Sequence, residues 1–404
     1  MVAVTSVTPG ARAPDGSPPG RSAPAGAPRV WKSRGRLADG REIIYFDEAP
    51  GLGRAAVPDR RQIAPQQPAG AEDGARHGLR WDPLTGEWVV VAAARQDRTF
   101  LPPAEHCPLC PSRPGRLTEI PAPGYDVVVF QNRFPALTGS PATGPGARPP
   151  DLLAGRRPAH GRCEVVCFTS DHHRSFAGLS ASRVRTVLEA WADRTAELGS
   201  LPGIRQVYCF ENRGEQIGVT LHHPHGQIYA FPFVAPHTAR VLEQARAYAA
   251  AGRGNLFDDL VALERGERTR VVARNEHWIA FVPAAARWPF ELMLFPARRV
   301  ADLPSLGEAA RDAFCPLYLD VLRRLDALFG APMPYIAAWN QAPAGDGPAR
   351  EVFGLHLRLQ PLMRARGKLK YLAGTESGMG VWVTDMTPED AAARLRGLGR
   401  LSPG

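Results

Sequence analysis

The chain has 404 residues and a formal net charge of +9, from 49 Lys and Arg against 40 Asp and Glu. The Arg residues are scattered, without a dense basic block or an aromatic platform, so we expect no nucleic-acid partner. No apolar run is long enough to span a bilayer, and no apolar region of a signal peptide follows the start. We therefore expect a soluble, cytoplasmic protein without a membrane partner.

The first 78 residues differ in composition from the rest of the chain. Residues 1–30 are crowded with Pro, Gly, Ala and Ser and show no periodicity, which predicts disorder. Residues 36–47 predict a small hairpin around an Asp-Gly turn, and a linker rich in Pro, Gln and Arg follows. We therefore interpret residues 1–78 as a disordered N-terminal tail that carries one short hairpin.

A compact body is expected to begin near Leu79, and its pattern occurs twice. The first copy reads strand, strand, helix, strand, strand, with Ser180 as the expected N-cap of the helix. The second copy follows at an offset of about 125–150 residues. Two such copies predict an α+β fold with a mostly antiparallel sheet and flanking helices, in halves 79–240 and 241–398. The first copy comprises 125–130, 162–168, 180–198, 206–210 and the segment that carries His225; the second comprises 277–283, 290–296, 306–328, 335–340 and 353–359.

The most informative segment is His223-Pro224-His225-Gly226-Gln227, at the start of an expected strand. Period-two spacing places His223, His225 and Gln227 on one face. A neutral imidazole is a competent nucleophile toward phosphorus, so we predict a phosphoryl or nucleotidyl transfer site with His225 as the nucleophile. The alternative for His225 is a histidine that packs near a turn, and the alternative for Gln227 is an ordinary glutamine on a surface strand. We expect the second ring nitrogen of His225 to donate to a backbone carbonyl near Val219, and Gln227 to donate to a phosphate oxygen.

Cys107 and Cys110 form a C-x-x-C pair in a Pro-rich loop. The spacing suits zinc but supplies only half of a tetrahedral site, so a redox pair and plain packing stay open as alternatives. Cys163, Cys167 and Cys209 lie in apolar, strand-like runs and are expected in the core. No disulfide framework is expected in a cytoplasmic chain.

An ordered set of motifs from about Arg80 to Leu398 resembles the galactose-1-phosphate uridylyltransferase family, a branch of the histidine-triad superfamily. The resemblance implies two histidine-triad-like halves. The motifs are E-N-x-G-x-x-x-G ahead of H-P-H-G-Q-I, D-P-L-T-G-E-W at 82–88, C-P-L-C-P at 107–111, V-F-Q-N-R-F-P-A-L at 129–137 and W-P-F-E at 288–291.

The resemblance implies a ping-pong reaction. A histidine at the position of His225 attacks the α-phosphorus of UDP-glucose, and the uridylyl-histidine passes UMP to galactose 1-phosphate. It also implies that four residues contact the phosphates: Asn212, Gly218, Thr220 and Gln227. Arg95 and Arg98 would lie near the phosphates, and the alternative for these two is an ordinary solvated surface. Asn132 would lie near the nucleotide.

The family pattern also completes the metal site. It adds His172 and His223 to Cys107 and Cys110, which implies one structural Zn2+ that orients His225. His173 and His222 are neighbours that resemble ligands but do not match the pattern. Some family members hold a second metal in the other half; here Asn340 and His356-Leu357-Arg358 replace histidines of that site, so we predict no second metal.

Near the end of the chain, Lys370 and Glu376 match the family's sugar-recognition segment, whereas Trp382 stands where a Gln is common. The resemblance implies a homodimer whose sites lie near the subunit interface. Two alternatives stay open. One is a related nucleotidyltransferase or phosphorylase that acts on another nucleoside-diphosphate sugar, such as ADP-glucose. The other is a catalytically silent nucleotide-binding protein, against which the intact His225 and Gln227 argue.

Overall fold

The computed structural model describes residues 29–55, 58–62, 77–97, 99–139 and 151–400. The disorder expected for residues 1–30 falls almost wholly outside these ranges, as does most of the linker before residue 77. Within the ranges, no helix is long and apolar enough to cross a membrane.

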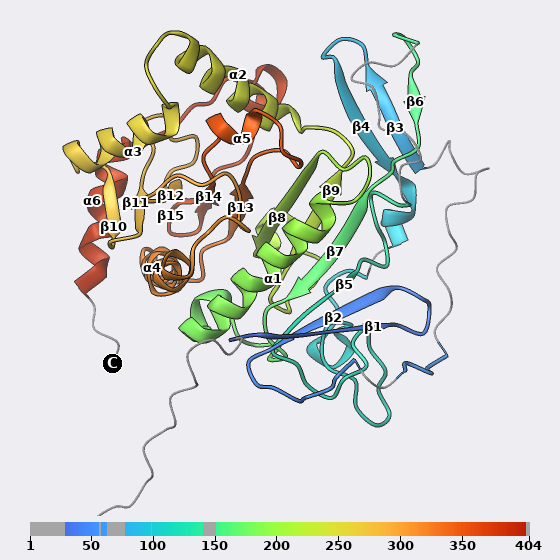
Figure 1. The fold of residues 1–404 in the computed structure, drawn as a ribbon. Helices are drawn as coiled ribbons and strands as arrows, with labels where there is room; N and C mark the ends of the chain where they lie inside the picture. Colours follow the sequence, from blue (N-terminus) through green and yellow to red (C-terminus); the bar gives the residue numbers. More distant parts are fainter. Residues whose placement is uncertain (1–28, 56–57, 63–76, 98, 140–150, 401–404) are drawn as a thin grey trace, which may run out of the picture.

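One antiparallel sheet of eleven strands runs through the described molecule (Figure 1). Its order is β1-β2-β5-β7-β9-β8-β13-β14-β12-β11-β10, and every neighbouring pair is antiparallel. The predicted α+β fold with a mostly antiparallel sheet is confirmed. The strands are β1 Trp31–Arg36, β2 Glu42–Asp47, β5 Val127–Gln131, β7 Arg162–Cys167, β8 Gln206–Arg213, β9 His225–Phe231, β10 Val271–Arg274, β11 Trp278–Phe281, β12 Leu292–Pro296, β13 Tyr335–Asn340 and β14 His356–Pro361.

The sheet order has an internal symmetry about its centre. Strands β5, β7, β9 and β8 on one side correspond to β11, β12, β14 and β13 on the other, and β8 pairs directly with β13. Each set carries one long helix after its second strand, α1 (Ala181–Gly199) or α4 (Glu308–Ala327). Ser180 caps α1 as predicted, because its side chain accepts a hydrogen bond from the Arg183 amide.

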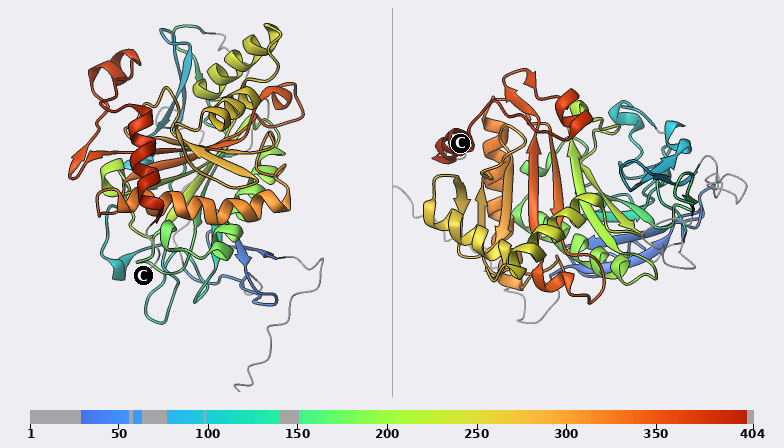
Figure 2. Two further views of the ribbon diagram at one scale, coloured as in Figure 1. Left: turned by 90° about the vertical axis from the view of Figure 1, so that its left-hand side faces the viewer. Right: turned by 90° about the horizontal axis from the view of Figure 1, so that it is seen from above.

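Alternation along the strands divides the core between the two faces of the sheet. In β2, Ile44 and Phe46 belong to the large cluster beneath α1 and α4, whereas Ile43 and Tyr45 belong to a cluster on the opposite face. Helices α1 and α4 lie side by side on their face (Figures 1 and 2). A single sheet therefore supports two separate layers.

The opposite face is covered differently in each half. In the second half, helices α2 (Pro236–Ala250) and α3 (Leu256–Glu267) cover β11 and β12. In the first half the cover is a loop, in which Cys107, Leu109 and Ile120 pack against Val128 and Cys167. This loop fixes the C-x-x-C pair over β5 and β7, next to the start of β9.

The remaining elements are short or peripheral. Two small sheets lie outside the main one, and helix α6 packs against β10. Helices α2, α3 and α6 were not predicted from the sequence. The elements are β3 His77–Asp82, β4 Glu87–Ala92 and β6 Arg156–Arg157; β15 Met363–Ala365 and β16 Lys368–Leu369; and helices α5 Ala349–Val352 and α6 Pro388–Gly397.

The N-terminal hairpin differs from its expected role in a tail. Strands β1 and β2 form a hairpin from Trp31 to Asp47, but β2 also pairs with β5, so both strands belong to the main sheet. The reason is burial on both faces: Ile43, Ile44 and Tyr45 are at most 2% exposed. The predicted hairpin is therefore present, but its strands are part of the main sheet and not of a tail.

A buried ion pair connects α1 to the sheet and to this hairpin. The Arg194 guanidinium donates to both carboxylate oxygens of Glu164 at 2.8 Å, and both side chains are at most 2% exposed. Arg162 bridges Glu164 to Glu42 of β2. The free-energy cost of burying these two charges is offset only while each charge keeps its partner.

Replacing Arg194 by Met should therefore lower the free energy of unfolding by about 3–5 kcal/mol, because Glu164 keeps only part of its compensation. Urea unfolding checks this value. The control is Arg364→Met, which removes the 2.9 Å pair to Asp385 between half-exposed side chains and should change stability by no more than about 0.5 kcal/mol. Equal effects of the two substitutions would contradict a special role for the buried pair.

Candidate active site

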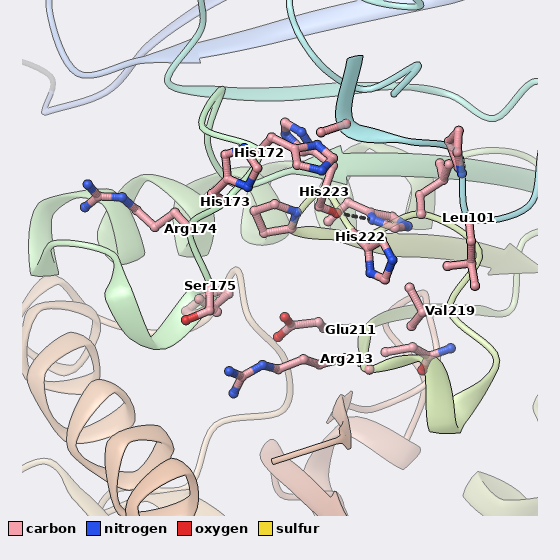
Figure 3. A pocket seen from close by; sticks show the side chains of 18 of the residues that line it. Leu101, His172, His173, Arg174, Ser175, Glu211, Arg213, Val219, His222 and His223 are labelled. Carbon is pink, nitrogen blue, oxygen red and sulfur yellow. Dashed lines mark hydrogen bonds between the residues drawn. The ribbon is translucent and has the colours of Figure 1, made fainter. Parts of the chain in front are cut away.

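The first residue of β9, His225, lines a cavity of about 600 Å³. The cavity is lined by the segment after β7, by the end of β8 and by the loop that precedes β9. Asn212, at the end of β8, shares this lining with His225. Figure 3 shows Glu211 and Arg213 across the cavity from His172 and His173.

One short hydrogen bond fixes the orientation of His225. Its Nδ1 lies 2.6 Å from the carbonyl oxygen of His223. Because a carbonyl only accepts, Nδ1 carries the hydrogen and Nε2 keeps its lone pair. The predicted acceptor near Val219 is therefore wrong: the acceptor is the nearer carbonyl of His223, where the chain bends just before β9.

The surroundings of His225 favour a neutral imidazole. Burial lowers the pKa of His225 below its usual value of 6.5, and the hydrogen bond to His223 opposes this shift only in part. A group whose pKa is lowered in this way is unprotonated at neutral pH. Gly226 follows, and a Cβ there would lie 2.8 Å from the Phe168 ring and from the Phe210 carbonyl, so only glycine fits between His225 and Gln227.

Two of the residues expected at the phosphates line a second cavity of about 600 Å³. Arg95 and Thr220 share it with Phe100. Val219 and Leu221 line the first cavity, so the loop that carries Thr220 borders both cavities. The loop bends at Gly218, whose φ of +77° favours glycine.

The other sequence-predicted contacts lie at different places. Asn132 follows β5. Its side-chain oxygen accepts from the backbone N–H of Phe134, and its backbone N–H donates to the Cys163 carbonyl. It lines neither of the two cavities around His225. Arg98 lies outside the described residues.

Sequence reasoning gave no role to Glu211, although it begins the E-N-x-G motif. Its side chain is 4% exposed and accepts a 3.0 Å hydrogen bond from the Tyr335 hydroxyl of β13. Burial raises the pKa of Glu211 to about 7. Next to it, Arg213 is paired with Asp326 of α4. Residues of the second half thus fix Glu211 and Arg213, which line the cavity. This contact depends on the pairing of β8 with β13, which the sequence alone does not show.

Four potential metal ligands gather beside the start of β9. One atom each of Cys107, Cys110, His172 and His223 lies within 4.8 Å of the others. The Cys110 Sγ is 3.5 Å from Nδ1 of His172 and 3.6 Å from Nδ1 of His223. Atoms bound to one zinc lie about 4 Å apart, so two thiols and two imidazoles in this arrangement fit a closed tetrahedral site.

The contacts around these four residues also suit a metal. Nε2 of His223 lies 2.8 Å from the Thr169 carbonyl, so Nδ1 is the unprotonated nitrogen that faces Cys110. The Leu109 amide donates to the Cys107 sulfur. Burial lowers the pKa of His223 to about 4, which keeps the ring neutral, as a ligand must be.

The two neighbouring histidines do not join the cluster. Nε2 of His222 lies 3.2 Å from Glu215, and His173 is not part of the four-residue group. This agrees with the choice of His172 and His223 that the family pattern implied.

The equivalent strand of the second half has different chemistry. His356 begins β14 and its Nδ1 lies 2.9 Å from the Gly354 carbonyl, as His225 does toward His223. However, the His356 ring is buried against Phe295 and Phe353, and Arg358, two residues on, is paired with the buried Glu291. In β9 the corresponding positions hold a partly buried imidazole that lines the cavity, His225, and an amide, Gln227.

Lys370 and Glu376 lie in the segment after β16 and face each other at 3.2 Å. The Thr375 hydroxyl and the Lys370 ammonium lower the pKa of Glu376 to about 2, so its carboxylate is charged. Neither residue lines a cavity next to His225. Within one chain, the structure does not bring them to the cavities at His225.

Fold and site together define a duplicated α+β nucleotidyltransferase, with an oriented histidine at the start of one strand. Comparison with known families agrees. Residues 70–235 match the model of the galactose-1-phosphate uridyl transferase N-terminal domain, and residues 241–402 match that of the C-terminal domain. The chain belongs to the galactose-1-phosphate uridylyltransferase family.

Individual relatives support this assignment. A galactose-1-phosphate uridylyltransferase of Streptomyces lividans is 48% identical over 90% of this chain and 97% of the relative. That of Thermotoga maritima is 35% identical over 79% and 97%. A solved uridylyltransferase structure, 30% identical, covers 80% of this chain and 98% of its own with a TM-score of 0.69. An ADP-glucose phosphorylase from Arabidopsis thaliana, at 21% identity and a TM-score of 0.61, shares the fold.

If the four-residue cluster holds zinc, replacing Cys107 by Ser should lower the zinc content and the melting temperature, because the site loses one of two thiolates. Metal analysis of the purified chain and a thermal melt check both effects. Cys315→Ala is the matched control, since this buried cysteine of α4 lies outside the cluster. It should keep its zinc. A zinc-replete Cys107→Ser protein would refute the metal assignment.

Proposed function

We propose that this protein transfers a uridylyl group between UDP-glucose and galactose 1-phosphate through a covalent intermediate on His225. The observation that carries the proposal is the orientation of His225, with Nδ1–H held by the His223 carbonyl and Nε2 left as the nucleophile in a cavity. The names of two relatives, each covered to 97%, give the transferred uridylyl group and galactose 1-phosphate, and the family resemblance supplies UDP-glucose as the donor.

The chemistry consists of two matched displacements. Nε2 of His225 forms a bond to the α-phosphorus of UDP-glucose while the bond to the bridging oxygen breaks, and glucose 1-phosphate leaves with that electron pair. A phosphate oxygen of galactose 1-phosphate then attacks the same phosphorus and frees the imidazole. One nucleophile serves both sugars because the group that it holds is common to both. Gln227 would donate to the phosphoryl oxygens as charge develops on them.

Asn212, Gly218, Thr220 and Arg95 would surround the phosphates, and Asn132 would contact the nucleotide. Thr220 and Arg95 already share a cavity, and Asn212 shares another with His225, which supports the roles of these three residues. Arg98 is retained as a phosphate contact by resemblance alone. We also retain the division into halves 79–240 and 241–398.

We propose one structural zinc, held by Cys107, Cys110, His172 and His223. Four protein ligands leave no open position, so the ion would supply stability and orientation rather than Lewis-acid chemistry. Its benefit to catalysis would pass through His223, whose carbonyl holds His225. All six cysteines lie outside disulfides, which suits the cytoplasm, where we place the reaction.

We further propose that the protein acts as a homodimer, in which Lys370 and Glu376 of one chain face the sugar phosphate bound by the other. Within a chain these residues line neither cavity at His225. The segment around them exposes several large apolar side chains, which favours contact with another surface. These are Tyr371 (73% exposed), Leu372 (48%), Met379 (81%), Val381 (59%) and Val383 (52%).

Replacing His225 by Asn should abolish covalent labelling, because an amide nitrogen is not a nucleophile toward phosphorus. Intact-mass spectrometry after exposure to UDP-glucose should show one added uridylyl group on the wild type and none on His225→Asn. His277→Asn, in the turn before β11, is the control and should label normally. If the wild type reacts with ADP-glucose and phosphate but not with UDP-glucose, UDP-glucose is not the donor and the proposed reaction is refuted.

The dimer proposal predicts complementation between two inactive chains. His225→Asn lacks the nucleophile and Lys370→Ala lacks the cation, but a mixed dimer has one site with both. Co-expression of the two variants should restore about a quarter of wild-type turnover if subunits mix at random. Turnover no higher than that of the separate variants, with mixed dimers present by mass, would refute a contribution from the partner chain.

A further inference from the structure

A row of hydrogen bonds crosses the face of β9 that carries Gln227. The Arg95 Nη1 donates to the Phe134 carbonyl at 3.3 Å and to the Tyr229 hydroxyl at 3.0 Å. The Tyr229 hydroxyl in turn lies 3.2 Å from Oε1 of Gln227. Tyr229 is two residues beyond Gln227, so period-two spacing places both side chains on the same face.

The direction of these hydrogen bonds follows from the chemistry of the donors. A guanidinium has only donors, so the Tyr229 oxygen must accept from Arg95. The hydroxyl hydrogen is then available to Gln227, and the amide oxygen is the atom that can accept it. Arg95 therefore determines, through Tyr229, which end of the Gln227 amide faces the hydroxyl. The two hydrogens on Nε2 are left for another acceptor.

Packing holds the Tyr229 ring in place. The ring makes edge-to-face contacts with Phe210 of β8 and Phe231 of β9, with centroids 5.3 and 5.9 Å away. Its backbone is paired on both sides, with Cys163 of β7 and with Tyr208 of β8. A fixed ring makes the hydroxyl a fixed reference for the amide.

We propose that Tyr229, held by Arg95, is a positioning residue that keeps the Gln227 amide turned with its NH2 group toward the phosphoryl group in transfer. This rests on the function proposed above. The two ends of an amide have nearly the same shape but opposite polarity. Without the hydroxyl, the amide can rotate and present Oε1 to a phosphoryl oxygen, which would repel the charge that develops there.

Tyr229→Phe removes only the hydroxyl and tests this role. We expect kcat to fall about fivefold to tenfold, the effect of one neutral hydrogen bond, while the KM for UDP-glucose stays within about twofold. The split arises because the orientation of Gln227 matters most in the transition state. Tyr208→Phe is the matched control, because Tyr208 lies directly opposite on β8, stacks on Phe210 and has no hydrogen bond to Gln227. It should leave kcat unchanged.

A double-mutant cycle separates positioning from general damage. In a Gln227→Ala background, Tyr229→Phe should cause no further loss of kcat, since the hydroxyl acts only through the amide. If Tyr229→Phe acts only through general damage to the structure, its fold-loss of kcat should multiply with that of Gln227→Ala. This outcome would overturn the inference. Unchanged kcat in Tyr229→Phe alone would also overturn it. A wild type that takes no uridylyl group from UDP-glucose would overturn the proposed function first and this inference with it.

Discussion

The site depends on one residue, His223, that belongs to two structures at once. Its ring lies in the four-residue Cys/His cluster, and its backbone carbonyl accepts the hydrogen of His225 Nδ1. Whatever fixes the ring therefore also fixes the carbonyl that holds His225. The loop that carries Cys107 and Cys110 is packed over β5 and β7 by apolar contacts, so the first half of the sheet is the rigid support for both.

The sequence predicted elements whose apolar pattern is strong, and motifs whose residues are close along the chain. Helix α1, with its Ser180 cap, and the two copies of strand-strand-helix-strand-strand are examples. Helices α2 and α3 were missed because their buried faces are small; α2 buries only Thr238, Leu242 and Ala245. The hairpin was assigned to a tail because its pairing with β5 joins residues about 85 positions apart, which local patterns do not record.

The same limit applies to the candidate site. The four residues of the Cys/His cluster could be named from the family pattern, because each lies in a recognisable motif. The acceptor for His225, the Glu211–Tyr335 contact and the row from Arg95 to Gln227 could not, because they depend on which strands are neighbours. Sequence thus predicted the members of the Cys/His cluster better than it predicted how side chains are oriented around His225.

The direct pairing of β8 with β13 has a consequence for the history of the molecule. Two separate copies joined edge to edge in this way would dissociate on dilution, whereas a covalent link makes their association independent of concentration. Once linked, one copy could lose its reactive centre without loss of the assembly. The second copy fits this account. Its His356 ring is buried among aromatic side chains, and Arg358 is paired with Glu291, so packed contacts stand where the first copy has a cavity.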